Sequence, residues 1–285
     1  MDGSAEAPAA GTVLNALANG YGAAFAIDEY VTASVAIDPE ADDVTGRVVG
    51  APDADTRLVE RCVEVAAAAV ERPGVGGTVE TESEVPMASG LKSSSAAANA
   101  TVLATLDALD AAESVPCEDA ARLGVDAARD VGVTATGAFD DASASMLGGL
   151  TVTDNTEDAL LTRDEVDWDV LVWTPPRQSF SADADVGRCE RIAPVADLVR
   201  ELALAGRYET AMTVNGLAFC AALDQPTDPA VDALPAAAGV SLSGTGPSYV
   251  AVGERAALED VRGIWDGYEG DTWFTTTQTA GARTT

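Results

Sequence analysis

Apolar and polar residues alternate along several stretches of this 285-residue chain. An alternation of period two is typical of strands that bury one face. Pro175 and Pro176 end one of these stretches, and glycines interrupt another, as residues of turns do. The pattern therefore predicts strands at 30–37, 77–85, 170–174 and 271–276, and a strand–turn–strand unit at 240–253.

Other stretches repeat their apolar residues every three or four positions, which is the period of a helix with one buried face. The first of them, 57–71, is followed by Pro73 and Gly74, a combination that stops helices. Its buried face is expected at Leu58, Cys62, Val65, Ala69 and Val70. The pattern predicts a helix at 57–71. Further helices are expected at 94–111, after the break at 86–90, and at 117–131 and 255–265, with helical structure between 193 and 223.

The predicted strands and helices follow one another without the regular strand–helix–strand repeat of a doubly wound sheet. This order favours the α+β class. A chain of 285 residues is long enough for one large domain or two closely packed ones. We place the division at residue 155, which gives an N-terminal domain at 1–155 and a C-terminal domain at 156–285.

The charge of the chain excludes several classes of function. Sixteen basic and 47 acidic residues give a formal net charge of −31, which repels phosphate backbones and anionic lipids. We therefore expect no nucleic-acid partner and no membrane partner. The sequence contains no histidine, so it cannot build a Ser-His-Asp triad, a histidine base or a Cys/His zinc site.

Despite this charge, 47% of the residues are hydrophobic and the mean hydropathy is +0.09, as expected for a packed globule. Apart from Lys92, every basic residue is an arginine. An acidic surface almost without lysine is typical of proteins from salt-saturated cytoplasm, where a Debye length of about 3 Å screens the repulsion. The four cysteines form no CxxC pair, and neither a signal peptide nor an apolar membrane span is visible. We expect a halophilic, cytoplasmic protein with free thiols.

The most informative stretch is 86–99, which reads PMASGLKSSSAAAN. Here a strand ends, Gly90 permits a tight bend, and three serines open a helix of small residues. The start of a helix offers unpaired N–H donors, and Lys92 adds a positive charge, so the stretch suits a polyphosphate. It is not the common P-loop, because Leu91 stands where that motif needs glycine. The alternative interpretation is a serine cap on a buried alanine-rich helix.

Two further stretches are candidates for chemistry. Residues 241–249, SLSGTGPSY, form a glycine turn between two predicted strands, for which a plain hairpin turn is the alternative. It fails as a dinucleotide fingerprint because Tyr249 replaces the third glycine. Residues 136–141, TGAFDD, carry Asp140 and Asp141 in an apolar setting, where one carboxylate would accept a hydroxyl proton or hold a metal ion. An Asx turn is the alternative for these aspartates.

Together the three stretches resemble the GHMP small-molecule kinases, and more narrowly the archaeal-type shikimate kinases. The phosphate loop of the family, Pro-x-x-x-Gly-Leu-x-Ser-Ser, is matched by Pro86, Gly90, Leu91, Ser93 and Ser94. The narrower resemblance rests on residues 136–142 and on 15–28, NALANGYGAAFAID, and the likeness covers essentially the whole chain. The sequence lacks the Arg- or Lys-containing start that is usual in the family.

The resemblance implies a GHMP kinase two-domain fold, with a ribosomal-protein-S5-like N-terminal domain, a ferredoxin-like C-terminal domain and ATP between them. It implies a catalytic aspartate ahead of Gly148 and Gly149; counting along the motif favours Asp141 and leaves Asp140 as the other candidate. Mg²⁺ is expected on Ser94 and Asp130, although the family usually has Glu at the latter position. The ATP-binding residues are expected to be Pro86, Met87, Ala88, Ser89, Gly90, Leu91, Lys92, Ser93, Ser94, Ser95 and Ala96, with Gly244 and Gly246.

The reaction implied by the resemblance moves the γ-phosphoryl group of ATP to the 3-hydroxyl of shikimate, in the aromatic amino-acid route. The alternatives are another GHMP activity, of the homoserine or mevalonate type, and a nucleotide-binding homologue without catalysis. The carboxylate of shikimate calls for a bidentate cation, and Arg177, just past the strand at 170–174, is one candidate. The sequence does not indicate an oligomeric state.

Overall fold

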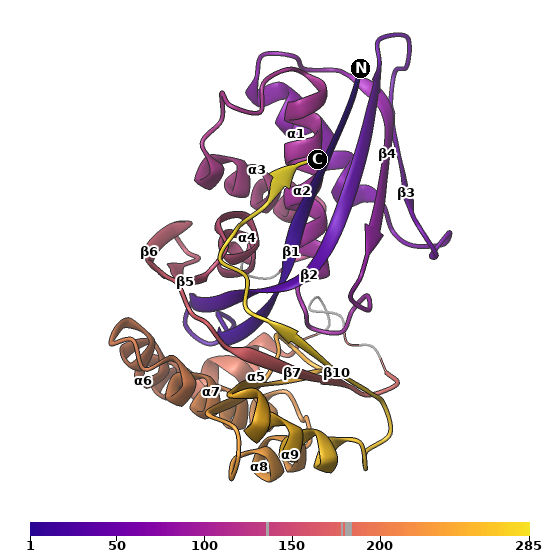
Figure 1. Ribbon diagram of the computed structural model, residues 1–285. Helices are drawn as coiled ribbons and strands as arrows, with labels where there is room; N and C mark the ends of the chain where they lie inside the picture. Colours follow the sequence, from indigo (N-terminus) through magenta and orange to yellow (C-terminus); the bar gives the residue numbers. More distant parts are fainter. Residues whose placement is uncertain (135–136, 178, 180–183) are drawn as a thin grey trace.

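The computed structural model describes residues 1–134, 137–177, 179 and 184–285, and contains two sheets with helices packed on them (Figure 1). In the first sheet the order β11-β1-β2-β4-β3 is extended by β5, which pairs with the start of β2, and by β6. All of these pairs are antiparallel except β3 with β4. The strands are β1 (Asp2–Leu14), β2 (Tyr21–Asp38), β3 (Val44–Val48), β4 (Gly76–Ser83), β5 (Leu150–Asp154), β6 (Ala159–Asp164) and β11 (Arg283–Thr284).

Four helices accompany the first sheet, and α2 lies at their centre. It packs on β1 and β2 and also contacts α1, α3 and α4, so it is buried on nearly every side. This position explains its sequence, because Ala and Thr side chains are small enough for close packing in all directions. The helices are α1 (Arg57–Ala69), α2 (Ser93–Ala108), α3 (Cys117–Asp130) and α4 (Phe139–Leu147).

The second sheet has four antiparallel strands in the order β10-β7-β9-β8. Numbered along the chain, this is the order 4-1-3-2 with helices between the first and second and between the third and fourth strands, so the expected ferredoxin-like domain is confirmed. Its strands are β7 (Asp169–Thr174), β8 (Gly239–Leu242), β9 (Tyr249–Gly253) and β10 (Asp271–Thr276). Its helices are α5 (Val186–Cys189), α6 (Ala193–Leu204), α7 (Tyr208–Ala222), α8 (Asp228–Ala233) and α9 (Arg255–Trp265).

The chain crosses between the two sheets twice. After the first crossing it completes the second sheet, and residues 277–285 then return to the first, visible as the yellow trace in Figure 1. On this return Gln278 N donates to Ala26 O, Ala282 N donates to Met146 O, and β11 pairs with β1. The sequence predicted a domain division between residues 155 and 156. The first sheet also contains β6 and β11, which lie beyond this division in the sequence.

The α+β class and all the predicted strands and helices are confirmed. Most ends shift by three residues or fewer, but β2 begins at Tyr21, nine residues before the strand predicted at 30–37. The region 193–223 contains two helices, α6 and α7, separated at Gly206. The buried face expected for the first helix is wrong in detail: α1 buries Val59, Cys62, Val63, Ala66 and Ala67, while Leu58 faces a cleft. In the described part of the chain no helix is long and apolar enough to cross a membrane.

Candidate active site

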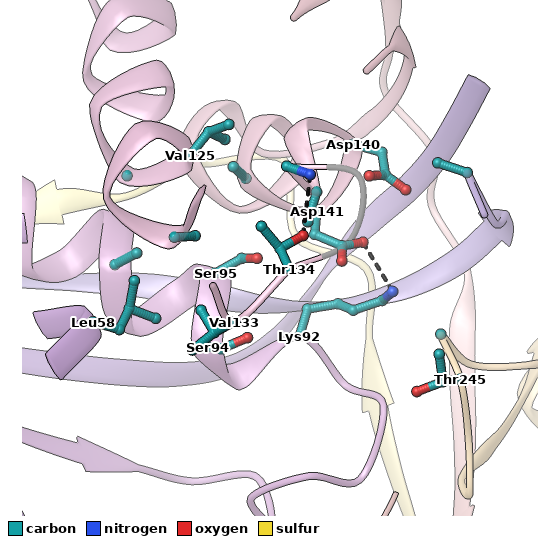
Figure 2. Close-up of a pocket in the computed structure, with 18 of the residues that line it drawn as sticks. Leu58, Lys92, Ser94, Ser95, Val125, Val133, Thr134, Asp140, Asp141 and Thr245 are labelled. Atoms are coloured by element: carbon teal, nitrogen blue, oxygen red, sulfur yellow. Dashed lines mark hydrogen bonds and ion pairs between the residues drawn. The ribbon is translucent and has the colours of Figure 1, made fainter. Parts of the chain in front are cut away.

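A cleft opens where the N-terminal ends of α2 and α4 meet the turns that follow β1 and β8 (Figure 2). Its empty volume is about 750 Å³, including the open mouth. Most of the lining comes from the first domain, while Gly244 and Thr245 come from the second. Leu58, Val125, Ala128 and Val133 give one part of the cleft an apolar wall.

The loop between β4 and α2 presents a helix start to the cleft. Gly90 has φ 88° and Lys92 has φ 64°, so two left-handed residues turn the chain into the helix. The first intrahelical bond of α2 joins Ala96 N to Lys92 O at 3.0 Å. The amides of residues 93–95 therefore have no partner inside the helix and form the positive end of its dipole.

The glycine turn of the second domain packs directly on this loop. Ser243 Oγ donates to Gly90 O at 2.8 Å, and Ser248 N donates to Ser89 O at 3.1 Å. A Cβ at Gly90 would lie 2.2 Å from Ser243 O, so only glycine allows this approach. The turn does join two antiparallel strands, as the hairpin interpretation predicted, but it also forms one wall of the cleft.

Lys92 and Asp141 form an ion pair inside the cleft, with 2.9 Å between Nζ and Oδ1 (Figure 2). Their side chains are 10% and 13% exposed. Asp141 lies in the first turn of α4, which Gly137 (φ 85°) and Ala138 (φ 54°) lead into. The pair thus joins the starts of two helices and brings together two residues that the sequence analysis singled out separately.

Asp140, beside it, is in a different environment and is 4% exposed. Its carboxylate accepts a hydrogen bond from Asn155 Nδ2 at 2.6 Å, and its backbone N donates to Asn155 Oδ1 at 3.1 Å. Burial, together with the negative charge of Asp141, raises the pKa of Asp140 to about 7 from its ordinary 3.8. Gly22 makes room for this carboxyl, since a Cβ there would lie 2.4 Å from Asp140 Cγ.

The other predicted site residues are not all near the cleft. Ser94 and Ser95 line it, whereas Pro86 and Met87 are exposed and Leu91 is buried. Asp130 is 50% exposed at the end of α3, where its carboxylate pairs with Arg61 at 2.7 Å. It does not line the cleft. Thr136, part of the motif at 136–142, lies outside the described residues.

Arg177 follows β7 and is exposed; its guanidinium donates to Gln225 Oε1. Gln225 Nε2 in turn donates to Thr245 O at 3.5 Å, and Thr245 lines the cleft. Arg177 therefore reaches the cleft wall through one intervening side chain.

Sequence reasoning missed four polar residues of this region. Asn155 fixes Asp140, Thr134 Oγ1 accepts from Gly137 N at 3.1 Å, and Asn15 Nδ2 donates to Gly244 O at 2.9 Å. Thr245 lines the wall between the domains. Asn15 is the first residue of a stretch that carried the family resemblance, so the sequence held a signal for it. Asn155 is an isolated Asn after a strand, and such a residue gives no signal of a functional role.

No cluster of three or more His, Cys, Asp or Glu side chains suited to a metal ion occurs among the described residues. The residues that line the cleft and carry a side-chain oxygen atom are Asn15, Ser94, Ser95, Thr134, Asp140, Asp141 and Thr245. This donor set suits Mg²⁺, which usually takes one or two protein ligands and completes its coordination with water and substrate phosphate.

Comparison with known proteins identifies relatives along the whole chain. The family model "GHMP kinases N terminal domain" matches residues 57–149. A shikimate kinase from Halobacterium salinarum is 66% identical over 287 aligned residues, covering 100% of both chains. A shikimate kinase from Methanosarcina mazei is 47% identical and covers 99% of this chain and 96% of its own.

Two solved structures show the same fold. Homoserine kinase from Cytophaga hutchinsonii superposes with a TM-score of 0.76 at 17% identity, covering 100% of this chain and 97% of the other. The mevalonate kinase of Methanococcus jannaschii gives a TM-score of 0.77 at 14% identity, covering 96% and 98%. At these identities the likeness concerns the fold alone.

Proposed function

Because this chain belongs to the shikimate kinases of the GHMP kinase family, we propose that it transfers the γ-phosphoryl group of ATP to the 3-hydroxyl of shikimate. The products are 3-phosphoshikimate and ADP. The identity of 66% over the full length supports the acceptor, and the Lys92–Asp141 pair at the mouth of the phosphate loop supports the chemistry.

In this proposal the loop at 86–96 holds the triphosphate of ATP. The free amides of residues 93–95 and the ammonium group of Lys92 supply hydrogen bonds and positive charge, as polyphosphate binding requires. Gly244 borders the cleft, where an added Cβ would lie 3.0 Å from Lys92 Nζ, so the glycine leaves room beside the ammonium group; Gly246 does not line the cleft. The apolar wall at Leu58 and Val125 gives the remainder of the nucleotide a surface to pack on.

Asp141 is the proposed catalytic carboxylate. It lines the cleft and is paired with the cation that faces the phosphates, so an acceptor hydroxyl beside it is close to the transferred group. Asp141 orients this hydroxyl and takes its proton as the oxygen attacks phosphorus and the bond to ADP breaks. Asp140 is held by Asn155 and supports the turn that carries Asp141.

Mg²⁺ is the proposed metal, held by Ser94 and the phosphates of ATP. When bound, it neutralises charge that develops on the transferred phosphoryl group. Asp130 is turned toward Arg61 at the protein surface, so we do not include it among the ligands in this arrangement.

Arg177 is the proposed partner of the shikimate carboxylate. Gln225 orients its guanidinium beside the wall formed by Thr245. A planar guanidinium binds a carboxylate through two parallel hydrogen bonds, which a single lysine cannot do.

An assay of ADP release in molar KCl tests the function directly. Shikimate, homoserine and mevalonate are offered in turn, with the Asp141→Asn variant as the control for contaminating activity. We expect turnover with shikimate. Turnover with one of the other alcohols would reassign the acceptor, and ATP binding without turnover of any acceptor would indicate a homologue that has lost catalysis.

A further inference from the structure

Helices α2 and α4 are joined at two points along one face of α2. Lys92, at the start of α2, pairs with Asp141. Asn99 follows seven residues later, about two helical turns, and its Nδ2 donates to Ala142 O at 2.9 Å. The two contacts therefore reach consecutive residues of α4, one through a side chain and one through the backbone.

Asn99 is an unusual residue at this position. It is 0% exposed and its neighbours on α2, Ala98 and Ala100, are small and buried. Its Oδ1 has no hydrogen-bond partner among the described residues, although it lies close to Gly124 of α3, where an added Cβ would be 3.5 Å away. A buried acceptor without a partner lowers stability, and an apolar side chain would avoid this cost.

The two contacts respond differently to a ligand. Lys92 has one ammonium group, and a polyphosphate in the cleft competes with Asp141 for it. The bond from Asn99 to Ala142 O joins two groups without formal charge, and Asn99 does not line the cleft although Ala142 does, so neither a phosphate nor a change of pH competes for it directly. The Asn99–Ala142 bond is thus the contact that persists when Lys92 also binds a phosphate or separates from Asp141.

We propose that Asn99 is a positioning residue for phosphoryl transfer. Through Ala142 O it holds the first turn of α4, and hence Asp141, in register with the phosphate loop while Lys92 turns to the phosphates. This inference rests on the proposed function, because it assigns Asn99 to the same reaction. A shift of about 1 Å at a reacting group can lower turnover about 10²-fold, so even a small loss of register is measurable.

The test compares Asn99→Ala and Asn99→Leu with Thr105→Val. Thr105 is also fully buried on α2, but in the part of the chain that the structure describes its hydroxyl bonds only to Thr101 O of the same helix. We expect both Asn99 variants to lose about 10²-fold in kcat with KM for ATP changed less than about twofold. We expect Thr105→Val to be destabilised in denaturant without a loss of kcat. The leucine variant fills the site, so it serves if alanine prevents folding.

A double-mutant cycle separates positioning from general damage. If Asn99 acts through Asp141, Asn99→Ala lowers kcat strongly in the wild-type chain and hardly at all in the Asp141→Asn chain. Equal losses in both backgrounds, or normal kcat in folded Asn99 variants, would overturn the inference while leaving the kinase intact. A wild-type chain that phosphorylates no alcohol would overturn the proposed function, and this inference with it.

Discussion

The ammonium group of Lys92 lies 2.9 Å from the Asp141 carboxylate, and this ion pair spans the starts of two helices. Lys92 belongs to the phosphate loop itself, at the position that precedes the first residue of α2. The cation that faces the proposed catalytic carboxylate is therefore placed by the loop that we propose to bind ATP. The N-terminal stretch, which carries no Arg or Lys before Arg47, does not have to supply it.

Replacing Lys92 by alanine removes this cation. We expect Lys92→Ala to weaken ATP binding by about 1–3 kcal/mol, because a charge-assisted contact to phosphate is lost. Calorimetric titration with a non-hydrolysable ATP analogue in molar KCl measures the change. Arg57→Ala serves as the control, since Arg57 is 64% exposed and pairs with Asp55 on the surface. An unchanged affinity for the analogue would contradict the role of Lys92.

The two adjacent aspartates are distinguished by their amide variants. We expect Asp141→Asn to reduce kcat about 10²- to 10⁴-fold, the contribution usual for a general base, with ATP affinity preserved or increased. Asp140→Asn should cost far less, because Asn155 Nδ2 can still donate to the amide oxygen at this position. Steady-state kinetics of both variants measure the difference, and a reversed order of the losses would exchange the proposed roles.

Stability should depend on pH through Asp140. Its pKa is raised from 3.8 to about 7 in the folded chain, so the folded state holds a proton that the unfolded state has lost between these values. The contribution of this group to the free energy of unfolding is therefore largest below about pH 4. As the pH rises from there to about 7, the contribution falls by up to about 1.4 kcal/mol per pH unit. Above about pH 7 this contribution is constant.

The Asp140→Asn variant provides the comparison, since its amide does not titrate. Urea denaturation of both proteins at pH values from 4.5 to 8 should show that the variant gains stability relative to wild type as pH rises. Parallel curves over this range would indicate that the Asp140 carboxyl is ionised throughout.

Gly22 should be sensitive to a single methyl group. Gly22→Ala would place Cβ 2.4 Å from Asp140 Cγ, so we expect a loss of about 1–3 kcal/mol in stability together with reduced kcat. Gly263→Ala is the matched control, because its Cβ meets no atom within 4 Å. That variant should be neutral or slightly stabilised, since alanine favours the α9 helix. Denaturation curves and steady-state kinetics of the two variants show whether crowding at Asp140 lowers stability and kcat.

Arg177 should affect the acceptor alone. We expect Arg177→Ala to raise KM for shikimate about tenfold or more with KM for ATP unchanged, and Arg177→Lys to be intermediate because it keeps only the charge. The same assay on Gln225→Ala shows whether the orientation of the Arg177 guanidinium contributes to shikimate binding. If KM for shikimate stays at the wild-type value in Arg177→Ala, another group binds the carboxylate.

Elements with strong local signals were predictable from the sequence. Helices α3 and α9 have clear apolar periods, and β7 is ended by two prolines. Strands β1 and the first half of β2 were not predicted, because their small Ala and Gly residues are buried on both faces and leave no alternation. Helix α4 was missed because it is short and carries two acids in its first turn, which resemble an Asx turn.

The site was predictable where it is contiguous in sequence. The serines and Lys92 stand together and were found, as were Asp140 and Asp141. The pairing of Lys92 with Asp141 depends on how α2 and α4 pack, which no local pattern records. For the same reason the surface position of Asp130 could not be foreseen, since its spacing from Asp141 does not reveal which side of α3 it occupies.

Residues 277–285 complete the first sheet only after the whole second domain has been synthesised. Ala5 of β1 meets Thr284 of β11, so a strand that is synthesised before the second domain gains this outer neighbour only after that domain. Until then β1 is an open edge on which strands of other chains can pair. The first domain therefore gains this outer pairing, at Ala5 and Glu6, only once the second domain has been synthesised.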